Sequence, residues 1–247
     1  MLSAGGFAPG WMEGITEIMT LPVYPVFLHL AGQPVLIVGG GKVALRKARG
    51  LMESQADITV VSPVVAAELA PLPNVVLRRE KYQSSHINGP DVPQWRLVFA
   101  ATDDPAVNRQ VAADARKRNI LCCRCDASEE GDFSNGSVWR KEPVVVAVST
   151  SGASPVLAAK IAQTLVQTLD PSLVEHAALM DSWRARVLAE IADEQARATV
   201  LRQLGGDEML RVLHSGGAVA ARNLFESYLT AAKSGPPGAG EKTTAPD

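Results

Sequence analysis

A glycine-rich turn is the first part of the sequence that could do chemistry. Gly39, Gly41 and Ala44 have the spacing G-x-G-x-x-A, directly after the apolar run 34–38 and directly before a stretch typical of a helix. The first glycine of this pattern permits a tight turn, the second lets the backbone approach a pyrophosphate, and the small third residue lets the helix pack closely. The sequence therefore predicts a dinucleotide site at a helix N-terminus. The alternative is an ordinary glycine-rich turn at the edge of a sheet.

The residue that would recognise a ribose is missing from its expected place. An acidic side chain normally follows the glycines by about 20 positions, at the end of the second strand. Here Val60 and Val61 lead instead into Ser62 and Pro63. A hydroxyl or a backbone group must then contact the ribose, so charge alone does not distinguish NAD from NADP.

Small and polar residues follow a later apolar run. Thr102 and Asp103 come directly after the run 97–100, just before a helical stretch that begins at Pro105. Because the carboxyl ends of parallel strands line the ligand crevice, both residues are expected to face the dinucleotide. Thr102 or an aspartate can also cap the helix, and the two roles are compatible.

Asp126 is the candidate proton acceptor, because it closes the cysteine-rich run 121–126 at the same expected edge. Its alternatives are a helix cap or an ion-pair partner of Arg124. The same run holds all three cysteines, Cys122, Cys123 and Cys125. A metal site in these thiols is disfavoured, because adjacent strand residues point to opposite faces and no C-x-x-C pair is present.

The segment 149–155 is a run of hydroxyls and small residues between an apolar run and a helix. Such a loop can present N–H groups and hydroxyls to an anionic ligand. The alternative is a simple capped connection.

The elements that must position these residues alternate between strand and helix. Apolar runs typical of buried strands recur at 35–38, 58–61, 75–77, 97–100, 120–123 and 144–148. Helical stretches at 43–53 and 105–118 lie between them, so the sequence predicts an α/β fold with a doubly wound parallel sheet.

From Pro155 the chain is predicted to be helical, with breaks at Asp170–Pro171 and Gly205–Gly206. One apolar face of this half is expected in a core or a dimer interface. The residues of that face are Leu173, Val174, Leu179, Trp183, Val187, Leu188 and Ile191.

Composition excludes several classes of protein. The chain has 247 residues, 47% of them hydrophobic, and 24 basic residues balance 26 acidic ones. It lacks the basic excess of a nucleic-acid-binding protein and the roughly 18 unbroken apolar residues of a membrane span. Glu13 and Glu17 precede any basic residue, which is unlike a secretory signal. The odd, crowded cysteines indicate a reducing, cytoplasmic setting.

Several segments together resemble the precorrin-2 dehydrogenase family, the dehydrogenase and ferrochelatase module of siroheme synthase. The resemblance runs in order through residues 24–27, 35–48, 100–103, 126–127 and 148–158. It rests above all on Gly-Gly-Gly-Lys-Val-Ala-x-Arg-Lys-Ala and Ser-Gly-x-Ser-Pro. Two positions depart from the family pattern: Cys123 stands where asparagine is usual, and the segment 133–137 is more polar than the family's apolar stretch.

The resemblance implies NAD-dependent oxidation of precorrin-2 to sirohydrochlorin in siroheme biosynthesis. Some members also insert ferrous iron into the product. The family's fold implies a homodimer with the tetrapyrrole in a cleft, while the charge balance and the lack of an apolar span argue against nucleic acid or a membrane as a partner. The same fold divides this chain into a Rossmann domain (21–122), a dimerisation and substrate-cleft region (123–170) and a helical domain (171–233). Composition predicts a disordered start (1–20) and a disordered tail (234–247), because neither can bury enough apolar surface.

The family's residue roles transfer to matching positions. Asp126 would be the general base that accepts a macrocycle proton. The cofactor site would comprise Gly39, Gly40, Gly41, Lys42, Val43, Ser62, Pro63, Thr102 and Asp103. Because the substrate bears eight carboxylates, it needs cationic and N–H donors around a flat apolar body. Substrate contacts are expected from Cys123, Arg124, Phe133, Ser149, Thr150, Ser151, Gly152, Ser154 and Pro155.

Two competing hypotheses stay open. One is a dehydrogenase that passes sirohydrochlorin to a separate chelatase. The other is a module that senses NAD without chemistry, in which Asp126 is only a cap. The four histidines, His29, His86, His176 and His214, are interpreted as surface or packing residues rather than iron ligands.

Overall fold

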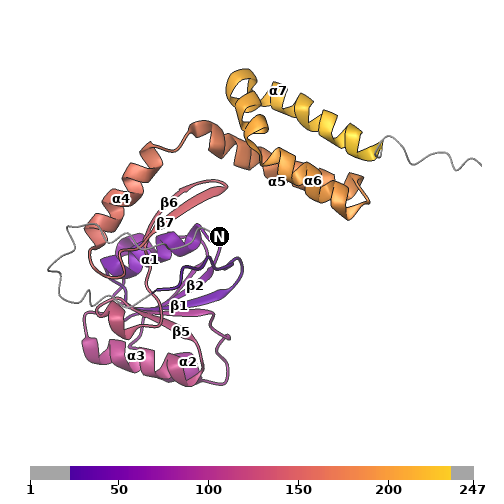
Figure 1. Cartoon of the computed structure of the whole chain (residues 1–247). Helices are drawn as coiled ribbons and strands as arrows, with labels where there is room; N and C mark the ends of the chain where they lie inside the picture. The colour runs from indigo at the N-terminus through magenta and orange to yellow at the C-terminus, as the bar shows by residue number, and fades with distance from the viewer. Residues whose placement is uncertain (1–22, 235–247) are drawn as a thin grey trace, which may run out of the picture. The chain divides into compact units, whose positions relative to one another are not determined.

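The computed structural model describes residues 23–234. The expectations for residues 1–20 and for the tail beyond Ser234 lie outside this range. Within it the chain forms two compact units (Figure 1). The first runs to Gly136 and includes Ser149–Pro155, and the second consists of Ser137–Val148 and the residues from Val156 onward.

The first unit is built on a parallel sheet whose strands occur in the order β3-β2-β1-β4-β5. The strands are β1 (Pro34–Val38), β2 (Asp57–Val61), β3 (Val75–Arg78), β4 (Leu97–Ala100) and β5 (Leu121–Arg124). This order places β1 at the centre, where the chain crosses from one half of the sheet to the other. Val38 of β1 pairs with Val61 on one side and Ala100 on the other, so the residues after these strands meet at one edge.

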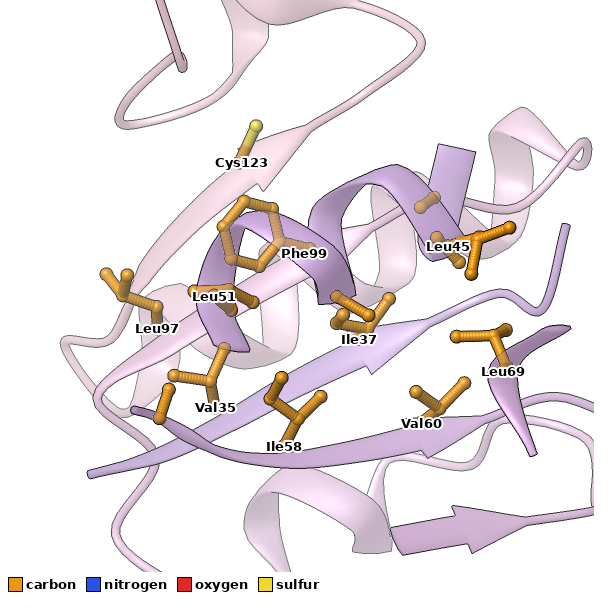
Figure 2. Packing of buried hydrophobic residues seen from close by; sticks show 14 of the residues in the cluster. Val35, Ile37, Leu45, Leu51, Ile58, Val60, Leu69, Leu97, Phe99 and Cys123 are labelled. Atoms are coloured by element: carbon orange, nitrogen blue, oxygen red, sulfur yellow. The ribbon is translucent and has the colours of Figure 1, made fainter. Parts of the chain in front are cut away.

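Helices cover both faces of this sheet. The first unit contains α1 (Lys42–Met52), α2 (Ser85–Asn88) and α3 (Pro105–Lys117), with short 3-10 turns at Ala67–Leu69 and Ser128–Glu130. Alternate residues of β1 enter opposite cores: Val35 and Ile37 pack with α1, whereas Leu36 and Val38 pack with α3. Figure 2 shows the first of these cores, in which side chains from α1 and from the neighbouring strands pack together. The predicted doubly wound α/β fold is confirmed.

One predicted strand has a different place. Val144–Val148 is strand β7, and it pairs antiparallel with β6 (Ser137–Lys141) in a separate two-stranded sheet. Its residues are half-buried or exposed, so the expectation of a sixth strand buried on both faces is wrong. The physical reason is that a short apolar run has the same composition in either kind of sheet. The boundary predicted between residues 122 and 123 also falls inside β5.

The second unit is helical apart from that hairpin, as predicted. Its helices are α4 (Pro155–Gln167), α5 (Pro171–Glu190), α6 (Glu194–Leu204) and α7 (Asp207–Lys233). The predicted break at Asp170 is a helix cap, because its carboxylate accepts a hydrogen bond from the backbone N–H of Ser172 at 2.9 Å. A further break before α6 was not predicted, and there Asp193 caps the helix by accepting from Ala196 N.

The core of the second unit centres on an aromatic stack. The rings of Trp183 and Phe225 lie 5.0 Å apart between centroids, at 22° to each other. Val187 and Ile191 pack into the same cluster, whereas Leu188 of the predicted apolar face is 48% exposed. Within residues 23–234, no helix combines the length and apolar character needed to cross a membrane.

Candidate active site

The glycine turn between β1 and α1 is held by backbone on two sides. Gly39 has φ 121°, and a Cβ there would lie 2.2 Å from the carbonyl oxygen of Ala101. A Cβ on Gly40 would lie 2.1 Å from the carbonyl oxygen of Val64. Because relieving either overlap would require the backbone itself to move, both positions require glycine.

Gly41 has a different environment, which fits an anionic ligand. It is exposed, and a Cβ on it would meet no other atom within 4 Å among the described residues. It is also the N-cap residue of α1, whose first N–H groups lack partners within the helix. Open space in front of such N–H groups is where a pyrophosphate binds, so this turn fits a dinucleotide.

The loop after β2 packs against the same turn. The backbone N–H of Gly39 donates to Val61 O at 2.9 Å, and that of Ala66 donates to Gly40 O at 2.8 Å. Ser62 is buried, and its hydroxyl donates to Val64 O at 2.7 Å. Ser62 and the exposed Pro63 therefore adjoin the glycine turn, as expected of residues near a ribose. In this arrangement, however, the Ser62 hydroxyl already donates its proton within the loop.

Thr102, after β4, is held by a residue that the sequence analysis missed. Asn108 of α3 is fully buried, and its side-chain oxygen accepts from Thr102 N at 3.1 Å and from the Thr102 hydroxyl at 2.7 Å. Its amide nitrogen donates to Thr102 O at 3.0 Å. Asp104 caps α3 through Ala106 N, as an aspartate was expected to do, while Asp103 is exposed. A buried asparagine inside a helix has no periodicity signal that could have identified it.

Asp126 lies just past β5, at the edge that also holds the glycine turn. Arg124 donates to both of its carboxylate oxygens, at 3.2 and 2.7 Å. This guanidinium, followed by a hydrogen bond from Asn108, holds the pKa of Asp126 below its usual value, against the opposing effect of burial. The predicted alternative of an Arg124 partner is thus present. It leaves Asp126 an ionised proton acceptor, 24% exposed.

Three residues predicted to contact the substrate are otherwise engaged. Cys123 is 3% exposed within the core that α1 covers, so its thiol faces protein. Phe133 packs edge-on against Phe99, with ring centroids 5.3 Å apart. Arg124 is buried and pairs with Asp126 and Glu130, both carboxylates of this chain. Contact with the substrate stays a prediction for all three residues, whose side chains are turned toward other parts of the protein by strand alternation and by local pairing.

The hydroxyl loop before α4 is ordered by its own hydrogen bonds. Thr150 accepts from Ser154 N at 3.0 Å and donates to Ser154 O at 3.0 Å, and Ser149 accepts from Ser151 N at 3.1 Å. Ser151 and Gly152 have φ values of 51° and 88°. The predicted capped connection describes this geometry. The exposed Gly152 and Pro155 remain accessible to a ligand.

Two of the histidines are packing residues in this structure. His86 is buried, with ring nitrogens 2.9 Å from Gln83 O and 3.1 Å from a Glu80 carboxylate oxygen. His176 is also buried, and its Nε2 lies 2.6 Å from Leu204 O. His214 is exposed and lies 3.8 Å from the Asp170 carboxylate.

Comparison with known proteins supports a dinucleotide-binding domain in this chain. Residues 26–137 match a family model described as putative NAD(P)-binding, which confirms the predicted class of cofactor. The siroheme synthase of Chromobacterium violaceum is 36% identical over 212 residues, covering 84% of this chain and 44% of that protein. The siroheme synthase of Methylococcus capsulatus is 37% identical over 214 residues, covering 85% of this chain and 44% of that protein.

The chain thus spans less than half the length of these relatives. Among solved structures, SirC, a precorrin-2 dehydrogenase, superposes with a TM-score of 0.67 at 24% identity, covering 84% of this chain and all of that one. That likeness establishes a shared fold.

Proposed function

Because the chain belongs to the precorrin-2 dehydrogenase family, the dehydrogenase module of siroheme synthase, we propose that it oxidises precorrin-2 to sirohydrochlorin with NAD as hydride acceptor. The observation that carries the proposal is the meeting of two features at one sheet edge: the open N-terminus of α1 at Gly41 and the ionised carboxylate of Asp126. The first suits an anionic cofactor, and the second can receive the proton that accompanies hydride loss.

Different residues of the chain bind the cofactor, accept the proton and contact the substrate. Gly39 and Gly40 fix the turn, and Gly41 with the first N–H groups of α1 receives the pyrophosphate. NAD, when bound, supplies the hydride-accepting nicotinamide. Asp126 takes the macrocycle proton, while Arg124 orients the carboxylate and keeps it ionised. The accessible Gly152 of the hydroxyl loop offers an N–H group to substrate carboxylates.

The test is anaerobic turnover of enzymatically generated precorrin-2 with NAD, followed by the absorbance of the product. We expect NAD-dependent formation of sirohydrochlorin by the reduced, full-length chain. Asp126→Asn should lower kcat by about two orders of magnitude, since an amide cannot accept the proton. NAD binding, measured by titration calorimetry, should stay unchanged in the variant. NAD binding without turnover in the unmodified chain would instead support a sensing module.

Ferrous iron insertion is the second candidate activity. It is favoured by the ionised state of Asp126, because metallation of the macrocycle also requires a base to remove pyrrole protons. The same assay with ferrous iron and sirohydrochlorin measures it. Iron insertion at the spontaneous rate would leave a dehydrogenase that passes its product to a separate chelatase.

We also propose that the chain acts as a homodimer. Leu157, Ile161 and Leu165 follow one another at four-residue spacing on α4 and are 49%, 36% and 50% exposed. An apolar helical stripe of this kind is typical of an interface between subunits. Sedimentation equilibrium of the full chain should give a dimer, and Ile161→Glu should shift it toward monomer. A monomer at micromolar concentration without the substitution would overturn this proposal.

A further inference from the structure

Two thiols flank Arg124 at the end of β5 and lie on the same side of the strand. Cys123 is buried in the α1 core, and Cys125 packs against the edge of that core while remaining partly exposed. A hydrogen bond joins the two side chains. Residues two apart on a strand share a face, whereas Cys122 points into the opposite core. The pair therefore comprises one accessible thiol backed by one protected thiol.

Positive charge from α1 faces this pair. The positive charges of Lys47 and Arg46 favour the thiolate form of Cys125, whereas the negative charge of Asp126 opposes it. Lys47 is fixed in place, because its ammonium donates to Asn135 Oδ1 at 2.7 Å and lies 5.5 Å from the ring centroid of Phe99. Phe99 in turn pairs with Cys123 across the β4–β5 ladder, and the two are neighbours in Figure 2.

The three cysteines consequently differ in thiolate character. The hydrogen bond from Cys123, followed by the charges of Lys47 and Arg46, lowers the pKa of Cys125 below that of an ordinary thiol. The same hydrogen bond and burial raise the pKa of Cys123. Burial raises the pKa of Cys122 to about 12. A partly exposed thiol in an electropositive setting is the kind that reacts with oxidants.

We propose that Cys125 is a peroxide-reactive thiol and that Cys123 resolves its oxidised form to an intrachain disulfide next to Asp126. The Cys125 thiolate attacks one oxygen of hydrogen peroxide, the O–O bond breaks, and a sulfenic acid and hydroxide form. The sulfur is oxidised by two electrons and the peroxide is reduced. The Cys123 sulfur then displaces the hydroxyl group from Cys125, and this group leaves as water with the thiol proton.

The disulfide has a consequence for the neighbouring residues. On an extended chain, the Cα atoms of residues i and i+2 lie about 6.6 Å apart. This distance is near the upper limit of about 6.8 Å between the Cα atoms of disulfide-linked residues. Bridging therefore draws the backbone together at Arg124, the residue that orients Asp126. We expect the oxidised chain to lose turnover and dithiothreitol to restore it. This consequence rests on the proposed dehydrogenase activity, whereas the thiol chemistry does not.

The first experiment follows the thiols themselves. The reduced full-length chain is treated with hydrogen peroxide, alkylated and analysed by peptide mass spectrometry. We expect the peptide containing both residues to lose two hydrogens through a Cys123–Cys125 link. Cys125 should react at least about tenfold faster than Cys122, as expected for an exposed thiolate against a buried thiol. Equal rates for the two, or a disulfide between chains, would overturn the proposal.

Variants separate the two steps. Cys125→Ser should abolish peroxide-dependent linkage, and Cys123→Ala should trap a sulfenic acid on Cys125 that dimedone captures. Cys122→Ala is the matched control, because it removes a neighbouring thiol from the opposite face and should leave oxidation unchanged. Linkage that persists in Cys125→Ser contradicts the assignment. If the reduced chain shows no turnover, the proposed function fails while these mass measurements still decide the thiol chemistry.

Discussion

The guanidinium of Arg124 donates to both carboxylate oxygens of Asp126, from Nε at 3.2 Å and from Nη2 at 2.7 Å. The Arg124 side chain is only 4% exposed, while that of Asp126 is 24% exposed. A buried cation thus orients a carboxylate that solvent or substrate can still reach. The proton-acceptor and ion-pair roles, which the sequence offered as alternatives, are therefore compatible in one residue.

The first prediction concerns the pH dependence of turnover. Because Arg124 lowers the pKa of Asp126, the base stays ionised to a more acidic pH than an ordinary aspartate. Arg124→Gln should raise that pKa and shift the acid limb of the kcat/KM profile to higher pH. Glu130→Gln is the control, since it removes the other carboxylate on Arg124 and leaves the Asp126 pair intact. An unmoved acid limb in Arg124→Gln would show that the arginine does not tune the base.

The same ion pair predicts a pH dependence of stability. A carboxyl whose pKa is lowered on folding stabilises the protein above its unfolded pKa of about 3.9 and loses this effect as pH falls through the folded pKa. The pair is partly exposed, so we expect about 1 kcal/mol from it. Urea unfolding should show that Arg124→Gln is less stable than the original chain at pH 7. The difference in free energy of unfolding between Arg124→Gln and the original chain should become smaller as the pH falls below the unfolded pKa of Asp126.

Two glycines of the same region test the cofactor site. Gly41→Ala should keep the fold, because the added Cβ meets no other atom within 4 Å among residues 23–234, yet it fills the space proposed for the pyrophosphate. We expect the Kd for NAD to rise by about tenfold or more, which is about 1.4 kcal/mol. Gly50→Ala, inside α1, should stabilise the fold by about 0.5–1 kcal/mol and leave the Kd unchanged. Equal NAD affinity in both variants would remove Gly41 from the cofactor site.

The sequence predicted the elements whose signals are local. The strands β1 to β5 and the glycine turn follow from apolar runs and from one motif in its required context. The β6–β7 hairpin was missed because a run such as Val144–Val148 has the same composition in either type of sheet. The side-chain directions of Cys123 and Phe133 depend on strand alternation and on contacts with Phe99, which no local pattern encodes.

Phe133 offers a test of the predicted substrate contacts. Because its ring packs edge-on against Phe99, Phe133→Ala should lower the free energy of unfolding by about 1–3 kcal/mol through lost packing. The KM for the tetrapyrrole should stay within about twofold of the original, a free-energy change well below 1 kcal/mol. Calorimetric melting and steady-state kinetics measure the two effects. A large rise in KM with unchanged stability would support Phe133 as a substrate contact.

Asn108 is predicted to be a positioning residue. Its buried amide holds Thr102 at the end of β4 through three hydrogen bonds and also reaches Asp126 after β5. Asn108→Ala leaves the half-buried Thr102 groups without these partners, which should cost about 1–3 kcal/mol of stability. Since Asp126 also loses a hydrogen bond, we expect kcat to fall by more than the KM for NAD rises.

A conservative variant separates this role from stability alone. Asn108→Asp keeps an oxygen that accepts from Thr102 N and from its hydroxyl. It also places a second carboxylate beside Asp126, and like charges raise the pKa of a carboxyl. The acid limb of the pH profile should therefore move to higher pH in Asn108→Asp. If Asn108→Ala melts earlier but both variants retain the original kcat and pH profile, Asn108 supports the fold only, and Asp126 is positioned by Arg124 without it.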